Sequence, residues 1–272
     1  MEEWLGHLRR GEVAATFDVS AEAYTQFMGR YSQPLAQAFM GSLWLRPGER
    51  VLDVGCGAGA LTAEIVAAQG SVGVAAVDPS PPFVASVSER FPDVDVREAS
   101  AEALPFEDGS FDVCAAQLVV HFMSDPRQGL AEMARVTRHG GRVAANVWDC
   151  GGVGGPLHAF WRAARALDPT VADESHLPGV RAGHLVELMR EAGLNEVIGG
   201  SIDIEVRHET FQEWWEPFTA GVGPAGAYLR TLNELHAKAL RERCRTDLGA
   251  GPVVVRAKAW TAQGVSGARL SA

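Results

Sequence analysis

This sequence has few lysines and no long apolar run. Lys238 and Lys258 are its only lysines, and the formal net charge at pH 7 is −10. Because affinity for nucleic acid depends on clustered cations that neutralise phosphates, we expect no nucleic-acid partner. No apolar run approaches the ~18 residues that a membrane span needs, and residues 1–10 lack the basic end and apolar core of a secretory signal. We therefore expect no membrane partner and a cytoplasmic, soluble protein.

Patterns typical of metal and redox sites are also missing. The four cysteines include no C-x-x-C pair, and no cluster of His, Cys, Asp and Glu has the spacing of metal ligands, so no metal site is predicted. The three tyrosines, Tyr24, Tyr31 and Tyr228, are followed four residues later by methionine or leucine rather than lysine. The Tyr-x-x-x-Lys pair of a short-chain dehydrogenase is therefore absent, which argues against an NAD-dependent oxidoreductase.

The 272 residues are 47% hydrophobic and 21% charged, which suits one large globular domain or a domain with a substantial insertion. Apolar strand patterns alternate with helical spacing, which predicts an α/β fold with a parallel, doubly wound sheet. Strands are expected near 50–55, 73–78, 93–98, 111–117 and 141–148, and helices near 60–68, 82–90 and 125–138.

The strongest motif runs from Val51 to Ala60 and reads V-L-D-V-G-C-G-A-G-A. A buried strand pattern gives way to Gly55, Gly57 and Gly59 before helical spacing resumes. Glycines suit such a loop because its backbone angles exclude a Cβ and because a ligand must approach the main chain closely. The motif also fits the loose dinucleotide fingerprint, so it predicts a nucleotide-like ligand site. The alternative is a structural turn without a ligand.

A second signal is the strand over residues 72–77, which ends at Asp78, close to the ~20-residue spacing of a ribose-binding acid. Ligands of such sheets bind at the carboxyl ends of the strands, so Asp53, Asp78, Gln117 and residues 100–102 should face one crevice. A carboxylate at Asp53, just before the glycines, is unhelpful beside an anionic pyrophosphate, but it can order the loop amides and attract an ammonium group directly or through water. This favours S-adenosylmethionine, a sulfonium amino acid, over a dinucleotide.

Residues 20–45 have helical spacing that Gly29 and Pro34 interrupt. The sequence predicts a helix, a break at residues 28–32, and a second helix. One interpretation is a lid over the cofactor, with Arg30 offered to a carboxylate and Tyr24 or Tyr31 covering the ligand. The other is an ordinary helix-capping turn.

Four segments resemble successive motifs of the class I S-adenosylmethionine-dependent methyltransferases. They are V-L-D-V-G-C-G-A-G (51–59), V-A-A-V-D-P-S (74–80), A-S-A-E-A-L-P-F-E-D-G-S-F-D (99–112) and E-M-A-R-V-T-R-H-G-G (132–141). The most similar branch, often called type 11, includes ubiquinone and menaquinone biosynthesis methyltransferases. The resemblance covers residues 20–150 and implies a Rossmann-like methyltransferase fold with seven strands.

The resemblance also implies roles for individual residues. The glycine loop would cradle the methionine part of the cofactor, Asp78 would bind the ribose, and Phe83 would pack on the adenine. Ser100 stands where the family commonly has Asp, so adenine recognition is weaker or differently made. The cofactor site predicted in this way consists of Tyr24, Arg30, Asp53, Gly55, Cys56, Gly57, Gly59, Asp78, Pro79, Phe83, Ser100, Ala101, Glu102 and Gln117.

Fewer sequence motifs bear on the acceptor of the methyl group. Residues 116–121 lack the Asn or Asp followed by Pro-Pro and an aromatic that holds a planar amine in DNA and amide N-methyltransferases, so a small organic acceptor is expected. His121 is the candidate general base; the alternative is a structural histidine. A protein that binds S-adenosylmethionine without catalysis and serves as a partner subunit remains a competing interpretation, as does the disfavoured oxidoreductase.

The chain divides into an N-terminal helical lid (1–46), a Rossmann-like core (47–150), and a remainder with a helical cap (151–272). Within the last part, helices are expected near 157–167, 182–192, 209–219 and 225–244. Strands near 196–207 and 252–262 would form an antiparallel edge pair. Its aromatic residues would either line a pocket for an apolar or aromatic acceptor or pack the core of the cap. These residues are Phe160, Trp161, Phe211, Trp214, Trp215, Phe218 and Tyr228. Trp214 and Trp215 are adjacent and cannot share one helix face, so one of them would line the pocket or a homodimer contact.

Overall fold

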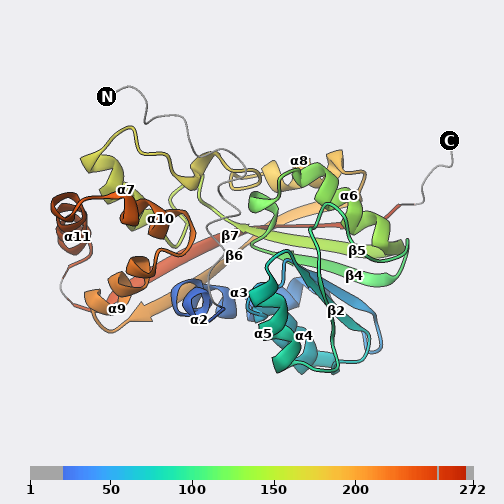
Figure 1. Ribbon diagram of the computed structural model, residues 1–272. Helices are drawn as coiled ribbons and strands as arrows, with labels where there is room; N and C mark the ends of the chain where they lie inside the picture. Colours follow the sequence, from blue (N-terminus) through green and yellow to red (C-terminus); the bar gives the residue numbers. More distant parts are fainter. Residues whose placement is uncertain (1–20, 250, 268–272) are drawn as a thin grey trace.

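The computed structural model describes residues 21–249 and 251–267, which form an α/β fold around one seven-stranded sheet. The strand order is β3-β2-β1-β4-β5-β7-β6, and neighbours are parallel except β7, which is antiparallel to β5 and β6 (Figure 1). The predicted doubly wound, mostly parallel sheet is confirmed. The strands are β1 (Val51–Val54), β2 (Val74–Asp78), β3 (Asp95–Glu98), β4 (Phe111–Gln117), β5 (Thr137–Trp148), β6 (Asn195–His208) and β7 (Val253–Val265).

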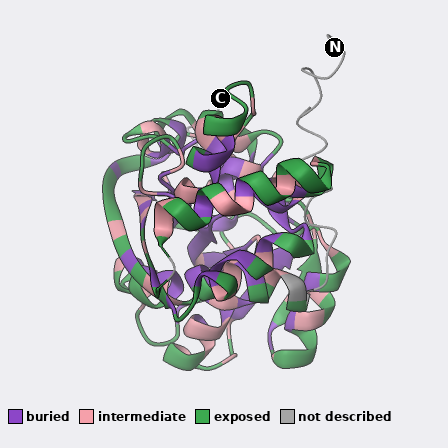
Figure 2. Cartoon of the chain, turned by 90° about the vertical axis from the view of Figure 1, so that its left-hand side faces the viewer, coloured by how far each residue is buried: buried purple, intermediate pink, exposed green. Residues whose placement is uncertain are grey.

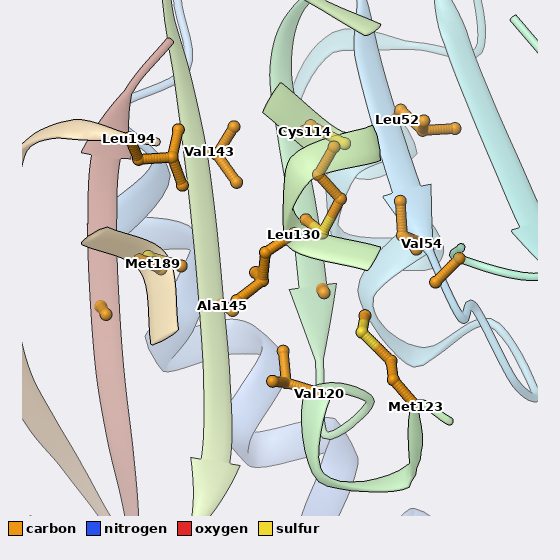
Figure 3. Close-up of a cluster of buried hydrophobic side chains, with 14 of the residues drawn as sticks. Leu52, Val54, Cys114, Val120, Met123, Leu130, Val143, Ala145, Met189 and Leu194 are labelled. Carbon is orange, nitrogen blue, oxygen red and sulfur yellow. The ribbon is translucent and has the colours of Figure 1, made fainter. Parts of the chain in front are cut away.

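Alternation along the strands creates two apolar faces, each covered by helices. Val51 faces α3 (Arg30–Leu43), α4 (Ala60–Gln69) and α5 (Pro81–Arg90). Its neighbour Leu52 faces α6 (Pro126–Val136) and α8 (His184–Glu191). Figure 3 shows the second of these layers, where Leu130 of α6 and Met189 of α8 pack on β1, β4 and β5. The central strands are therefore buried on both sides, as their unbroken apolar runs indicate.

Two predicted boundaries in the second half of the chain are wrong. Strand β5 begins at Thr137 rather than near 141, so the helix before it ends at Val136. The single helix expected at 225–244 is two helices, α10 (Gly223–Thr231) and α11 (Glu234–Leu248). Asn233 separates them because its side-chain oxygen accepts a hydrogen bond from the backbone N–H of His236 at 2.9 Å and starts a new helix.

The predicted break at residues 28–32 is also wrong. Helix α2 (Ala21–Tyr24) continues through a π turn, η1 (Thr25–Gly29), into α3. Gly29 adopts helical angles, and Pro34 inside α3 costs one backbone hydrogen bond without ending the helix. Residues 1–20 of the predicted N-terminal lid lie outside the described residues.

A helical cap lies beyond one end of the central strands, where β6 and β7 extend past them (Figure 1). Its helices turn their buried faces inward and their exposed faces to solvent (Figure 2). Besides α10 and α11 the cap contains α7 (His158–Leu167), η3 (Glu174–His176), α9 (Phe211–Trp215) and η4 (Glu216–Ala220), while η2 (Val120–Phe122) follows β4.

The aromatic residues of the cap pack against one another in its core. The rings of Phe160 and Phe218 stack with centroids 4.7 Å apart, and Trp214 is 1% exposed. Trp215 is buried as well and stacks on Phe211, so neither of the two tryptophans is exposed for the expected homodimer contact. Aromatic pairs of this kind stabilise the cap by about 0.5–1.5 kcal/mol each beyond their burial.

Candidate functional site

The glycine loop between β1 and α4 depends on backbone angles that only glycine takes readily. Gly55, Gly57 and Gly59 have φ of 71°, 51° and 80°. A Cβ at Gly55 would also lie 2.7 Å from Cγ1 of Val119, in the segment after β4. The loop is thus fixed both by its own conformation and by close packing against that segment.

Asp78, at the end of β2, holds this loop in place. One carboxylate oxygen accepts a hydrogen bond from the N–H of Gly57 at 2.8 Å, and the other accepts from the N–H of Ser80 at 2.9 Å. Burial raises the pKa of Asp78, and these two hydrogen bonds oppose the rise. The sequence interpretation gave Asp53 the task of ordering the loop amides; the carboxylate bonded to a loop amide is Asp78.

Asp53 is buried and accepts a hydrogen bond from the hydroxyl of Thr62, at the start of α4, with an O···O distance of 2.6 Å. Burial raises its pKa to about 7, against the opposing hydrogen bond from Thr62. A cation placed beside this carboxylate would lower its pKa again, because opposite charge stabilises the ionised form. Asp53 is therefore suited to meet an ammonium group.

The segment formed by α2, η1 and α3 is the described part of the predicted lid and is called the lid helix below. A cavity with about 640 Å³ of space, part of it open to solvent, lies between this helix and the glycine loop. Its lining includes Asp53, Gly55, Cys56, Gly57 and Gln117, which belong to the cofactor site predicted from the sequence. The lid contributes residues that sequence reasoning missed, because the expected break at 28–32 hid which face of the helix turns inward. These are Thr25, Gly29, Ser32 and Gln33.

Gln117 closes the cavity at the end of β4. Its side-chain N–H donates to the carbonyl of Ser32 at 2.9 Å, while its Oε1 is buried without a hydrogen-bond partner among the described residues. The next residue, Leu118, has φ of 62°, an uncommon angle for a side chain of this size. Strained backbone of this kind concentrates at functional sites.

The residues predicted for the adenine side are grouped differently. Phe83 of α5 is buried, and its ring meets the edge of Tyr24 with centroids 5.3 Å apart. Ser100 bonds to Glu102, and the other oxygen of Glu102 accepts from the N–H of Ser124 at 2.7 Å. Ala101 packs in the core on the α6 side of the sheet. The cavity lining does not include Phe83, Ser100, Ala101 or Glu102, nor does it include Asp78, Pro79 or Gly59.

Two other lid residues turn toward the cap rather than the cavity. Arg30 forms an ion pair with Glu213 of α9. The hydroxyl of Tyr31 lies 2.9 Å from Nε2 of His208 at the end of β6. The arginine that lines the cavity is instead Arg90, at the end of α5. Tyr24 lines the cavity and Tyr31 does not, so of the two tyrosines only Tyr24 is placed to cover a ligand there.

A second cavity with about 460 Å³ of space, part of it open to solvent, adjoins the first and shares Tyr24 and Leu118 with it. Its walls are mainly apolar, whereas the first cavity includes Asp53 and the loop amides. The aromatic residues predicted to line an acceptor pocket are not among its walls. The lining residues are Tyr24, Phe27, Met28, Leu118, His121, Phe122, Trp148, Cys150, Pro156, Leu157, Glu174, Gly223 and Pro224.

His121 and Glu174 are buried titratable groups that line this second cavity. His121 is buried, its Nδ1 has no hydrogen-bond partner among the described residues, and burial lowers its pKa to about 3. Glu174, from η3 in the cap, is buried too, and burial raises its pKa to about 7. The sequence gave no signal for Glu174, because only the folded cap carries it to the end of β4.

Residues 52–145 match the model of a family described as a methyltransferase domain. The chain is 37% identical over 132 residues to the demethylmenaquinone methyltransferase of Beutenbergia cavernae, a match that covers 48% of this chain and 53% of the relative. The chain thus spans about half the length of the curated relatives it matches.

Solved structures share the fold at low sequence identity. A Thermotoga maritima S-adenosylmethionine-dependent methyltransferase is 17% identical with a TM-score of 0.56, over 93% of this chain and 98% of that one. Phosphoethanolamine N-methyltransferase 2 of Haemonchus contortus, in complex with S-adenosyl-L-methionine, is 16% identical with a TM-score of 0.56, over 92% of this chain and 57% of that one. Within the described residues, no helix has the length and apolar character to cross a membrane.

Proposed function

Because this chain belongs to the class I S-adenosylmethionine-dependent methyltransferases, we propose that it transfers a methyl group from that cofactor to a small apolar or aromatic acceptor. The adjoining cavities carry this proposal. One is polar and follows the glycine loop, the other is mainly apolar, and Tyr24 and Leu118 form part of both. A donor and an acceptor bound in them would meet beside Leu118, shielded by the lid.

The residues of the first cavity fit the cofactor. Its ammonium group would be met by Asp53 and by the buried Oε1 of Gln117, which is a hydrogen-bond acceptor without a described partner. Asp78 borders the loop with two carboxylate oxygens that each retain capacity to accept a ribose hydroxyl. S-adenosylmethionine supplies a methyl group that its sulfonium already activates. The protein therefore has to align the acceptor and exclude water, an effect that reaches ~7–11 kcal/mol.

The second cavity suits the acceptor. Phe27, Phe122 and Trp148 give it aromatic walls, as in most sites for apolar ligands. The relative from Beutenbergia cavernae is named for demethylmenaquinone, which agrees with an apolar, aromatic acceptor. Burial holds the pKa of His121 low, so its imidazole is neutral near pH 7 and its unpartnered Nδ1 can accept a hydrogen bond from the acceptor. The same low pKa makes it a weak base, so proton abstraction by His121 requires that acceptor binding raise this pKa.

The test is a calorimetric titration of the purified protein with S-adenosylmethionine, S-adenosylhomocysteine and NAD in parallel. We expect micromolar binding of the first two and none of NAD. Binding of NAD alone would overturn the proposed cofactor and return the glycine loop to the dinucleotide interpretation. S-adenosylhomocysteine release across a panel of acceptors then separates an enzyme from a partner subunit, which would bind the cofactor and produce none.

A further inference from the structure

We propose that Glu174 binds the acceptor, and that the second cavity selects an uncharged aromatic molecule whose hydroxyl donates a hydrogen bond to this carboxylate. The inference rests on the proposed function, because it assigns the chemistry of the acceptor. It differs from the general-base hypothesis for His121, since it concerns recognition and places the deciding group in the cap.

Glu174 is held with one oxygen occupied and its side chain on the cavity wall. It is 7% exposed, and its Oε2 accepts a hydrogen bond from Nε1 of Trp161 in α7 at 2.9 Å. Asp173, directly before it, caps η3 by accepting from the N–H of Ser175 and forms an ion pair with Arg165 of α7. Two contacts therefore fix the short 3-10 turn against α7, so the carboxyl group keeps its place without a ligand.

Nothing charged faces Glu174 across this cavity to satisfy it. Among the described lining residues it is the only Asp, Glu, Lys or Arg, and His121 and Cys150 are the other titratable groups besides Tyr24. Burial raises the pKa of the Cys150 thiol and lowers that of His121, so both are neutral near pH 7. A buried carboxyl group that lacks an ion-pair partner is costly, and a ligand that hydrogen-bonds to it recovers part of that cost.

The same lining excludes other acceptors. Carboxylates and phosphates would meet Glu174 without any lining arginine or lysine to neutralise them. A protonated amine would lose its hydration in a mainly apolar cavity, a cost that can exceed the gain from pairing with Glu174, and its nitrogen has no lone pair to receive a methyl group. A hydroxyl on an aromatic ring would donate a hydrogen bond to the carboxylate and keep its oxygen lone pairs free, while the ring would lie against Phe27, Phe122 and Trp148.

Four naphthalenes of similar shape separate these chemistries: 1-naphthol, 1-methoxynaphthalene, 1-naphthoate and 1-naphthylmethylamine. Each is titrated into the full chain by calorimetry at pH 8, with and without saturating S-adenosylhomocysteine. Burial raises the pKa of Glu174 to about 7, so at pH 8 its carboxyl group is mostly ionised. We expect 1-naphthol to bind about 10- to 100-fold more tightly than the methoxy compound, the range of a hydrogen bond to a charged group. The naphthoate should bind most weakly. Equal affinities for naphthol and the methoxy compound, preference for the naphthoate or the amine, or no naphthol binding would each overturn the proposal.

Glu174→Gln sharpens the test because the amide oxygen can still accept from Trp161, leaving an amide N–H toward the cavity. We expect this variant to fold, to bind S-adenosylhomocysteine like the wild type, and to lose or reverse the preference for naphthol. Glu187→Gln, which removes an exposed carboxylate on α8, is the matched control and should leave the preference unchanged. A Glu174→Gln variant that keeps the wild-type preference would refute the assignment. Failure of S-adenosylhomocysteine to bind would instead refute the proposed function, and the titrations without it would still decide on Glu174.

Discussion

Replacing Gly55 by alanine tests whether the glycine loop is fixed by conformation and by packing together. Alanine at position 55 would have to adopt the φ of 71° that Gly55 has, which costs roughly 1–2 kcal/mol for an L residue. It would also lie 2.7 Å from Cγ1 of Val119, and overpacking of this kind costs about 1–3 kcal/mol. Urea denaturation at 25 °C should therefore show Gly55→Ala destabilised by roughly 2–5 kcal/mol.

A double-mutant cycle separates the two contributions. Val119→Ala removes the two Cγ atoms that lie nearest an added Cβ at Gly55 and leaves the Cβ of residue 119 at 3.1 Å, so the double variant should be less destabilised than the sum of the single variants by about 1–3 kcal/mol. The backbone cost should remain. Gly41→Ala is the matched control, because Gly41 lies in α3 with no atom within 4 Å of an added Cβ. It should be stabilised by about 0.4–1 kcal/mol. If Gly55→Ala is as stable as the wild type, or if the two changes are additive, the packing argument fails.

Three further changes test individual side chains. Asp78→Asn should weaken S-adenosylhomocysteine binding about 10- to 150-fold, because it loses a charge-assisted hydrogen bond worth roughly 1.5–3 kcal/mol. The control Asp93→Asn, at an exposed position, should leave the Kd unchanged. An unchanged Kd in a folded Asp78→Asn variant would remove Asp78 from the site. Burial raises the pKa of Glu174 from 4.5 to about 7. The folded chain therefore keeps a proton that the unfolded chain releases, and stability falls as pH rises between these values, by roughly 3 kcal/mol at ~1.4 kcal/mol per pKa unit. Glu174→Gln should reduce that fall in urea titrations at pH 5 and pH 8, and an identical fall in the variant contradicts the assigned pKa. His121→Ala should lower kcat by about 10²- to 10⁴-fold on an identified acceptor if His121 is the base, and near-normal turnover ends that hypothesis.

The core of the fold was predictable because its signals are local. The angles of Gly55 and Gly57, and the burial of Asp78 at a strand end, follow from a few neighbouring residues and from the way parallel sheets are built. The break expected at residues 28–32 failed because glycine and proline only disfavour a helix, and the packing of α3 on the sheet outweighs that preference.

The acceptor side was less predictable because it is assembled from distant segments. Tyr31 and His208 meet across 177 positions, and Glu174 reaches the cavity through a turn that α7 supports. The sequence alone does not distinguish a tryptophan that lines a cavity from one that fills a core. Thus Trp214 was a plausible pocket residue, whereas Trp148, at the end of β5, lines the pocket.

The lid helix contacts the cap as well as the sheet and α4. Arg30 pairs with Glu213, and the ring of Phe27 meets the edge of Phe218 with centroids 5.2 Å apart. Tyr24, in the same segment, borders both cavities. Under the proposed function, Tyr24 would contact both the cofactor and the acceptor. A shift of this segment against the cap would therefore change both cavities at once.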